Sequence, residues 1–212
     1  MSAFGNFDSG GGGAEGPFIQ WSARGTQDGA IPAKTFYLRE TDGKSPLPSF
    51  STGVVMDIAN MKTGWQRSDG VIGVVPDWKW NATVGRIEPQ PGDDWKKGLS
   101  IRCAISKTQA ATWEQAGAGA WNAFTALVPA LQQGPEGKLP VVRMIGAKLE
   151  QYKRGSTVIP TLEVIKWVER PDCLKEGMAA GFDAGVSTPA PTPVAQPSPQ
   201  AVPATAMADD EF

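Results

Sequence analysis

The chain contains no histidine among its 212 residues. Histidine is the commonest general base in proteins and a frequent zinc ligand, so its absence argues against a Ser-His-Asp hydrolase and against most zinc sites. Carboxylate metal chemistry would need a cluster of Asp and Glu, and the isolated pair Asp93-Asp94 beside Trp95 is better explained as a turn. We therefore expect a protein that is not an enzyme and that holds no metal and no cofactor.

Cysteine and long apolar runs are also scarce. Cys103 and Cys173 are the only two cysteines, and they are too few and too far apart for a disulfide framework or a zinc pattern. No apolar run approaches bilayer length, and the N-terminus lacks a basic segment followed by an apolar one. These absences predict a soluble, cytoplasmic protein without a membrane contact.

Positive charge is confined to the middle of the chain. All 20 Lys and Arg lie between Arg24 and Lys175. The stretch from Pro17 to Lys175 holds 15 acidic residues, which gives it a net charge of +5, while the other 7 acidic residues lie in the two ends. A basic body with acidic ends indicates a body that binds a polyanion and a tail that competes or recruits.

Composition divides the chain into one domain and two tails. Residues 1–16 are Gly-rich and poor in apolar residues, so we expect them to be disordered. Residues 17–176 carry the core signal and predict a single folded domain. In residues 177–212, prolines alternate with Ala, Thr, Val, Ser and Gln before an acidic end, which predicts a disordered linker and an acidic tip.

The clearest structural signal is the stretch from Leu139 to Pro171. Apolar and polar residues alternate with period two on both sides of the polar break at 153–156, which is typical of a hairpin. Pro160 in the second strand predicts an edge or a bulge there. Cations and rings gather around the turn, which suits a polyanion with stacking bases. A solvated hairpin with protective edge lysines is the alternative explanation.

The order of elements along the rest of the chain predicts the fold class. Strand patterns occur at 18–21, 35–40, 51–61 and 99–106, with short strands also expected within 71–75 and 81–87. Apolar residues recur at three- and four-residue spacing from Trp113 to Leu131, and Thr112 with Gln115 resembles a capping box, so a helix is expected over 110–131. Three strands, a helix and two strands predict a mainly β protein, a five-stranded OB-fold-like barrel with one α-helix between strands 3 and 4.

The segment 62–95 is irregular yet holds four tryptophans, and long loops of this kind are often functional. Its rings either stack on bases or fill a second small core. As residues that contact DNA we expect ring candidates for stacking and cation candidates for phosphate contact. The ring candidates are Tyr37, Trp65, Trp78, Trp80 and Tyr152, and the cation candidates are Lys79, Arg86, Lys148, Lys153, Arg154 and Lys166. Trp113, Trp121 and Phe124 are assigned to the core.

Two stretches resemble a known family. The strand from Pro160 to Pro171 resembles the last barrel strand of phage-type single-stranded DNA-binding proteins with an OB-fold. The Pro-rich linker closed by Asp209, Asp210, Glu211 and Phe212 is similar to the acidic tips of bacterial and phage single-strand binders, although it lacks the Pro that precedes Phe in bacterial versions. The resemblance implies sequence-tolerant binding of single-stranded DNA in phage replication and recombination. It also implies that the tip recruits replication or recombination proteins.

Two other functions remain as alternatives. A structural or assembly protein of a virus particle explains the Gly-rich and Pro-rich ends but leaves the charge segregation without a reason. A nuclease would need a carboxylate metal site, for which the sequence offers no cluster. We expect the body to be a monomer or a homodimer.

Overall fold

The computed structural model describes residues 17–70, 74–83, 86–153 and 155–175. The predicted disordered ends, 1–16 and 177–212, lie outside the described residues, as do Arg154 and the acidic tip. The described part is mainly β. Its strands are β1 (Phe18–Ser22), β2 (Thr35–Arg39), β3 (Lys44–Pro46), β4 (Val54–Met56), β5 (Lys62–Arg67), β6 (Asp77–Trp80), β7 (Lys96–Ala104), β8 (Ala110–Ala116), β9 (Leu139–Tyr152) and β10 (Gly155–Val168).

The described residues also form two α-helices and two 3-10 turns. They are α1 (Ser49–Thr52), α2 (Ala118–Leu131) and the 3-10 turns η1 (Ile58–Asn60) and η2 (Asp172–Leu174). The helix α2 packs against β10, β7 and β8. Within the described residues, no helix is long and apolar enough to cross a membrane.

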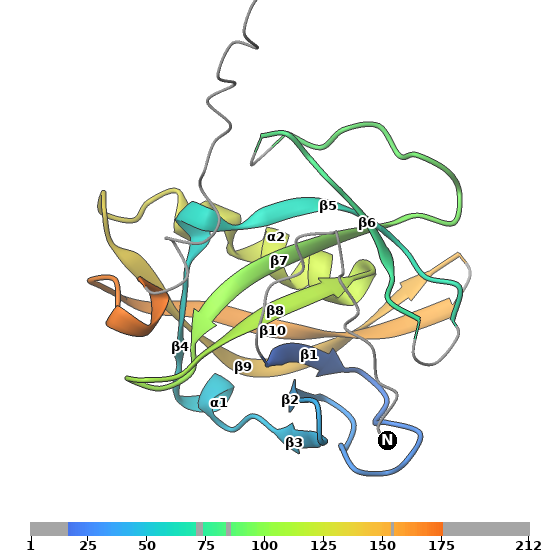
Figure 1. Ribbon diagram of the computed structural model, residues 1–212, viewed down its shortest axis with the longest axis horizontal. Coiled ribbons are helices and arrows are strands. Elements are labelled where there is room, and N and C mark those ends of the chain that lie inside the picture. The colour runs from blue at the N-terminus through green and yellow to red at the C-terminus, as the bar shows by residue number, and fades with distance from the viewer. Residues whose placement is uncertain (1–16, 71–73, 84–85, 154, 176–212) are drawn as a thin grey trace, which may run out of the picture. The chain divides into compact units, whose positions relative to one another are not determined.

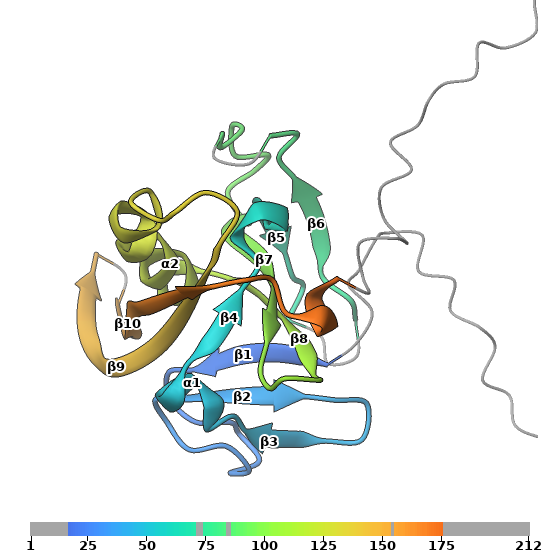
Figure 2. The ribbon, with the colours of Figure 1, turned by 90° about the vertical axis from the view of Figure 1, so that its left-hand side faces the viewer.

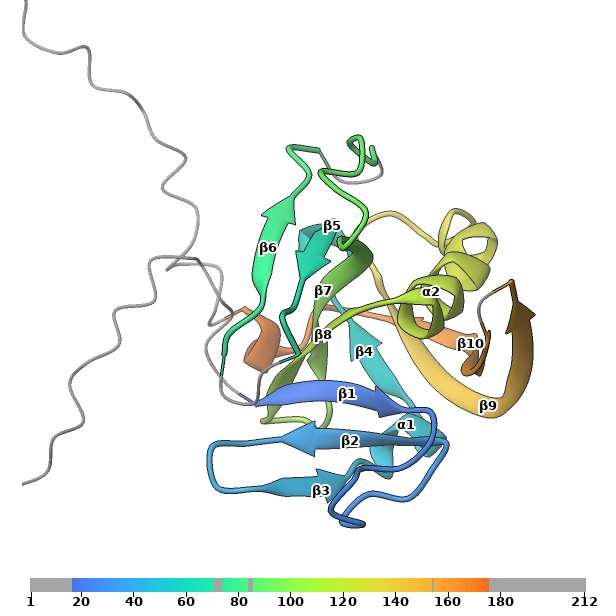
Figure 3. The same cartoon turned by 90° about the vertical axis from the view of Figure 1, so that its right-hand side faces the viewer.

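All ten described strands belong to one mixed sheet. Its main path runs β10-β9-β4-β7-β8-β1-β2-β3, and β5 and β6 branch from β7. The only parallel pair of this described sheet joins β1 to β8. Figures 2 and 3 show β1 to β3 stacked at one end, β5 and β6 at the other, and the β9–β10 hairpin beside α2.

The mainly β prediction is confirmed, but the closed five-stranded barrel is wrong. The described sheet has ten strands and ends at β10 and β3, so it is open. Side chains bridge β1 and β10: the indole Nε1 of Trp21 donates to the carbonyl oxygen of Val158 (2.9 Å), and Arg24, just after β1, donates to that of Ser156 (3.0 Å). These side-chain contacts join β10 to the region of β1 without a backbone ladder between the two described strands.

The predicted hairpin is confirmed as β9 and β10, two strands of 14 residues (Figure 1). β10 ends the sheet path, and a register shift follows Pro160, between Thr161 and Leu162. The expectation that Pro160 marks an edge or a bulge is therefore confirmed. Proline fits there because an outer strand does not need every N–H for the ladder.

The predicted helix begins too early. Residues 110–116 form β8, and the helix starts only after Gly117, whose φ of 106° favours glycine. Thr112 and Gln115 therefore do not form a capping box. Instead the side-chain amide of Gln115 bonds both backbone groups of Trp21, accepting from its N–H (2.8 Å) and donating to its carbonyl oxygen (3.1 Å).

Other boundaries differ from the sequence prediction as well. The expected strand 51–61 divides into the end of α1, then β4 and η1. Described residues within 81–87 form no strand, and of 71–75 only Val74 and Val75 are described, outside any strand. The pair Asp93-Asp94 lies in a turn, as expected.

The main core lies on one face of this sheet and is built around aromatic rings. Phe36 and Phe50 stack with centroids 3.8 Å apart, and Trp113 meets both edge-on. Trp113 and Phe124 are buried, as predicted, but Trp121 is partly exposed and is not a core residue. Leu99, Ile101 and Cys103 of β7 point into this core, while Gly98, Ser100 and Arg102 lie on the other face of β7, where Ser100 is also buried and Arg102 is partly exposed.

Candidate nucleic-acid interface

Strands β5 and β6 carry three of the four tryptophans of segment 62–95, and β7 lies next to β5. Trp80 lies opposite Gly64, which in turn lies opposite Gly98. Directly opposed residues share a face of the sheet, and so do residues two apart in a strand. We call this face the outer face. Its members on β5 to β8 are Lys62, Gly64, Gln66, Trp78, Trp80, Lys96, Gly98, Ser100, Arg102, Ala104, Ala110, Thr112, Glu114 and Ala116.

Two glycines allow the ring of Trp78 to approach β7 and the backbone of β6 to approach β5. A β-carbon at Gly98 would come within 2.6 Å of Cζ3 of Trp78, and one at Gly64 would come within 2.2 Å of the carbonyl oxygen of Lys79. Any larger residue would displace the ring of Trp78 or push β6 away from β5. The absence of side chains at these positions therefore creates the seat for Trp78 and Trp80.

Trp78 and Trp80 form a stacked pair. Their ring centroids lie 4.3 Å apart with an interplanar angle of 11°, and both side chains are partly exposed. The close pair holds each ring in one orientation, so little ordering is needed before a flat ligand packs against it. Of the four tryptophans between residues 62 and 95, these two are the ones that reach solvent, since Trp65 and Trp95 are buried.

Cations flank the stacked pair on the outer face. Lys96 is opposite Gln66, which is opposite Trp78, and Lys62 is opposite Ser100; both lysines are exposed. Arg102 lies further along β7, opposite Thr112; it is partly exposed and donates to the carbonyl oxygen of Cys173 (3.3 Å). Sequence reasoning missed all three cations. The sequence alone shows that polar and apolar residues alternate in β5 and β7. Only the register between the strands shows that these cations lie on the same face as Trp78 and Trp80.

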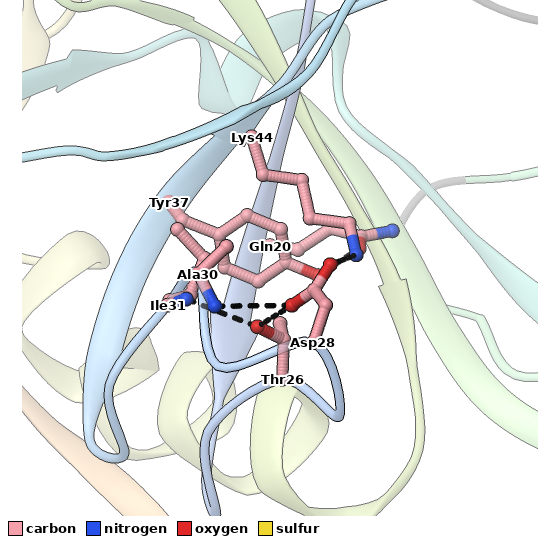
Figure 4. Close-up of polar contacts among 7 residues, drawn as sticks. All are labelled: Gln20, Thr26, Asp28, Ala30, Ile31, Tyr37 and Lys44. Atoms are coloured by element: carbon pink, nitrogen blue, oxygen red, sulfur yellow. Dashed lines mark hydrogen bonds and ion pairs between the residues drawn. The ribbon is translucent and has the colours of Figure 1, made fainter.

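The side chain of Asp28 holds together a compact loop between β1 and β2. The carboxylate of Asp28 accepts from the hydroxyl of Thr26 (2.5 Å), the backbone N–H of Ala30 (3.1 Å) and the ammonium of Lys44 (2.9 Å). These bonds hold the pKa of Asp28 far below its usual range, with the Thr26 bond as the largest cause. Figure 4 shows Tyr37 and Gln20 beside this loop.

Tyr37 and Trp65 are not available for stacking on bases. Tyr37 is 8 % exposed and donates its hydroxyl proton to Oε1 of Gln20 (2.6 Å). Trp65 is 7 % exposed and donates its indole N–H to the carbonyl oxygen of Glu88 (2.9 Å). Burial of both rings contradicts their predicted role, because a base needs an accessible ring face.

Lys79 lies on the opposite face of these strands. Its ammonium stands 5.0 Å from the ring centroid of Trp95, which Arg67 also covers at 5.3 Å. Lys97 stands over Trp65 (5.8 Å) and over Trp121 of α2 (5.7 Å). These cation–π contacts show that the opposite face points toward α2.

The turn of the β9–β10 hairpin is tied to α2. The amide of Asn122 donates to the hydroxyl of Tyr152 (2.8 Å), and Tyr152 donates to the carboxylate of Glu150 (2.5 Å). The ammonium of Lys148 pairs with the same carboxylate (2.8 Å). Lys148 is therefore paired within the turn, while the ring of Tyr152, 42 % exposed, stays accessible.

The predicted site residues consequently do not gather at one place. Trp78 and Trp80 lie on the outer face, whereas Lys79 and the Tyr152 turn lie toward α2. Figures 2 and 3 show α2 between β6 and the end of the hairpin. Lys153 at the turn, Lys166 on β10 and Arg86 in the loop after β6 are exposed, and Arg154 lies outside the described residues.

The part of the chain that the structure describes contains no group of three or more Cys, Asp and Glu side chains placed to hold a metal ion. Burial raises the pKa of the Cys103 thiol to about 12, so this thiol is not a ready nucleophile.

The comparisons with known proteins do not assign a family. No family model matches the chain, and neither a curated protein nor a solved structure matches it. The outer face therefore has to be interpreted from its own geometry and charge.

Proposed function

We propose that this protein binds single-stranded DNA without strong sequence preference, during phage DNA replication and recombination. The observation that carries the proposal is the stacked, partly exposed pair Trp78–Trp80 on a sheet face that also holds Lys62, Lys96 and Arg102. Rings that stack on bases beside cations that contact phosphates are the combination by which sequence-tolerant single-strand binders work.

The chemistry of the outer face favours single strands over duplex. Stacking of a base on an aromatic side chain contributes about 1–3 kcal/mol, and every base has a face that can stack. In a duplex these faces are covered by neighbouring base pairs. Phosphate contacts by Lys and Arg add affinity that is independent of sequence and falls with salt.

The order of five strands supports an OB-fold-like arrangement within the larger sheet. Counted along the chain, β4, β7, β8, β9 and β10 would be strands 1 to 5, with α2 between strands 3 and 4. Their order in the sheet, β10-β9-β4-β7-β8, is then 5-4-1-2-3, as in an OB-fold opened between strands 3 and 5. In that fold the face of strands 2 and 3 binds oligonucleotides, and here it would be the outer face of β7 and β8.

The acidic tip completes the proposal. Asp209, Asp210 and Glu211 place three negative charges beside the terminal apolar ring of Phe212. Such a segment suits a partner pocket that accepts a ring and pairs the charges with Arg or Lys. We propose that the tip recruits replication or recombination proteins to the DNA-bound protein.

Substitution of the stacked pair tests the binding proposal. Trp78→Ala and Trp80→Ala should each weaken binding of a fluorescein-labelled 15-mer of thymidine by about fivefold or more, at every salt concentration, because stacking is not screened. Trp167→Ala is the matched control, since this partly exposed tryptophan packs against Gly134 on a different element. Fluorescence anisotropy gives the affinities, and wild-type affinity in both variants of the pair would refute the proposal.

A further inference from the structure

One acidic side chain lies within the otherwise cationic outer face. Glu114 of β8 is directly opposite Ser100 of β7, which is directly opposite Lys62 of β5. Its carboxylate is partly exposed and accepts a hydrogen bond from the Ser100 side chain. Stacking and phosphate contact do not use this group, and its charge repels phosphate.

The position of Glu114 places it next to a base that packs on the tryptophan pair. The ring of Trp78 lies over Gly98, and Ser100 is the next residue of β7 on the same face. Same-face neighbours along a strand lie about 7 Å apart, and directly opposed residues about 5 Å. Of the two polar residues next to Gly98 on this face, Ser100 is buried and Glu114 is partly exposed, so Glu114 is the one within reach of a base that packs on the pair.

A carboxylate distinguishes bases by their hydrogen-bond donors. Ionised carboxylates only accept hydrogen bonds, and Asp and Glu accept from the amino group of cytosine. Adenine and guanine also carry exocyclic amino groups. Thymine offers a single ring N–H between two carbonyl oxygens, and a carboxylate repels those oxygens.

We propose that Glu114 is the specificity-determining residue of the outer face and that it accepts a hydrogen bond from the exocyclic amino group of a bound base. The protein then prefers amino-bearing bases, such as cytosine, over thymine. This inference rests on the proposed single-strand binding and adds a modest base preference to it. Burial raises the pKa of Glu114, and Ser100 and Lys62 oppose that rise, so the group is held among specific partners.

The test compares 15-mers of deoxycytidine and of thymidine, two pyrimidines of similar stacking area, at pH 7.5. The wild-type protein should bind the cytidine 15-mer about three- to tenfold more tightly. In Glu114→Gln the amide both donates and accepts, so the ratio should fall to about one, mainly because thymidine binding strengthens. Glu136→Gln, an exposed acid after α2, is the control for loss of one charge and should keep the wild-type ratio.

A second variant separates hydrogen bonding from charge. Glu114→Asp keeps the charge but withdraws the acceptor by one methylene, so the ratio should fall without stronger thymidine binding. Equal strengthening of both oligonucleotides in Glu114→Gln, or no base preference in the wild-type protein, would overturn the inference alone. Failure of the wild-type protein to bind either oligonucleotide would overturn both the inference and the proposed function.

Discussion

At the scale of single residues, the two tyrosines are kept neutral by different means. Burial is the main cause that raises the pKa of Tyr37, whereas the hydrogen bond that the hydroxyl of Tyr152 donates to Glu150 raises the pKa of Tyr152. In both residues the folded protein holds the phenol proton more tightly than the unfolded chain does. The stability they contribute is therefore complete below pH 10 and is lost as the pH rises through the folded-state values.

Alkaline titration of phenolate absorbance tests this prediction. Both tyrosines should ionise above pH 10, the ordinary value for a phenol, and Tyr37→Phe and Tyr152→Phe should each remove one of the two transitions. Glu150→Gln should lower the midpoint of Tyr152 and leave that of Tyr37 unchanged. A tyrosine that titrates at or below pH 10 in the folded protein would contradict the described contacts.

Arg170 forms an ion pair with the buried carboxylate of Asp57. The guanidinium of Arg170 donates to both oxygens of Asp57, one of them at 2.9 Å, and Asp57 is 2 % exposed. Without Arg170, the buried carboxylate keeps the hydrogen bond from the amide of Asn60 (2.9 Å) but loses its opposite charge, which is costly in a buried position. Arg170→Gln should therefore lower the free energy of unfolding by about 3–5 kcal/mol in urea titrations.

Lys138→Gln provides the control for this measurement. Its ion pair with Glu169 is exposed on both sides, so its loss should change the free energy of unfolding by about 0.5 kcal/mol or less. Equal effects of the two substitutions would show that the Arg170 pair is not a significant support of the end of β10.

At the scale of elements, the position of β6 and of its Trp78 side chain depends on Gly64 of β5 and Gly98 of β7. A methyl group at residue 98 would meet the ring of Trp78 at 2.6 Å and the β-carbon of Ala116 at 2.9 Å. Gly98→Ala should tilt Trp78 off the sheet, weaken thymidine 15-mer binding about fivefold, and cost about 1–3 kcal/mol of stability. Gly146→Ala, where a β-carbon meets nothing within 4 Å, should change neither quantity. Unchanged oligonucleotide binding by Gly98→Ala would show that the position of the Trp78 ring over Gly98 does not matter for binding.

The sequence predicted some elements well because their signal is local. The hairpin was recognisable since alternation, the polar turn and Pro160 all agree within 139–171. The start of the helix was missed because Trp113 and Ala116 fit a helical spacing with the residues after Gly117, although they lie in β8. A strand that leads directly into a helix extends the apolar pattern of the helix backward.

The candidate site was only half predictable for a different reason. Trp78 and Trp80 stand out by composition, but the cations beside them depend on which strand lies next to β6. Lys79 is adjacent to both tryptophans in sequence and yet points to the opposite face, because side chains alternate along a strand. The register between strands that are distant in sequence determines which cations lie beside the tryptophans, and no local sequence pattern encodes that register.

At the scale of the whole molecule, the charge is divided between a basic body and acidic ends. Deletion of residues 209–212 should abolish recruitment of a replication partner in pull-downs from infected-cell extract, as should Phe212→Ala. The deletion should also tighten single-strand binding at low salt, because three fewer negative charges compete with phosphate, and salt should remove this gain. Unchanged pull-down together with unchanged low-salt affinity would reduce the tip to a solubility tail.

The central claim is that exposed rings and cations of one sheet face bind single-stranded DNA, and a salt-resolved titration tests it most directly. Tryptophan quenching should be followed while single-stranded and duplex oligonucleotides of equal length are added at several salt concentrations. The account predicts at least about tenfold tighter binding of the single strand, or about 1.4 kcal/mol, with affinity falling steeply as salt rises. Equal affinity for duplex, or affinity that does not change with salt, would contradict it.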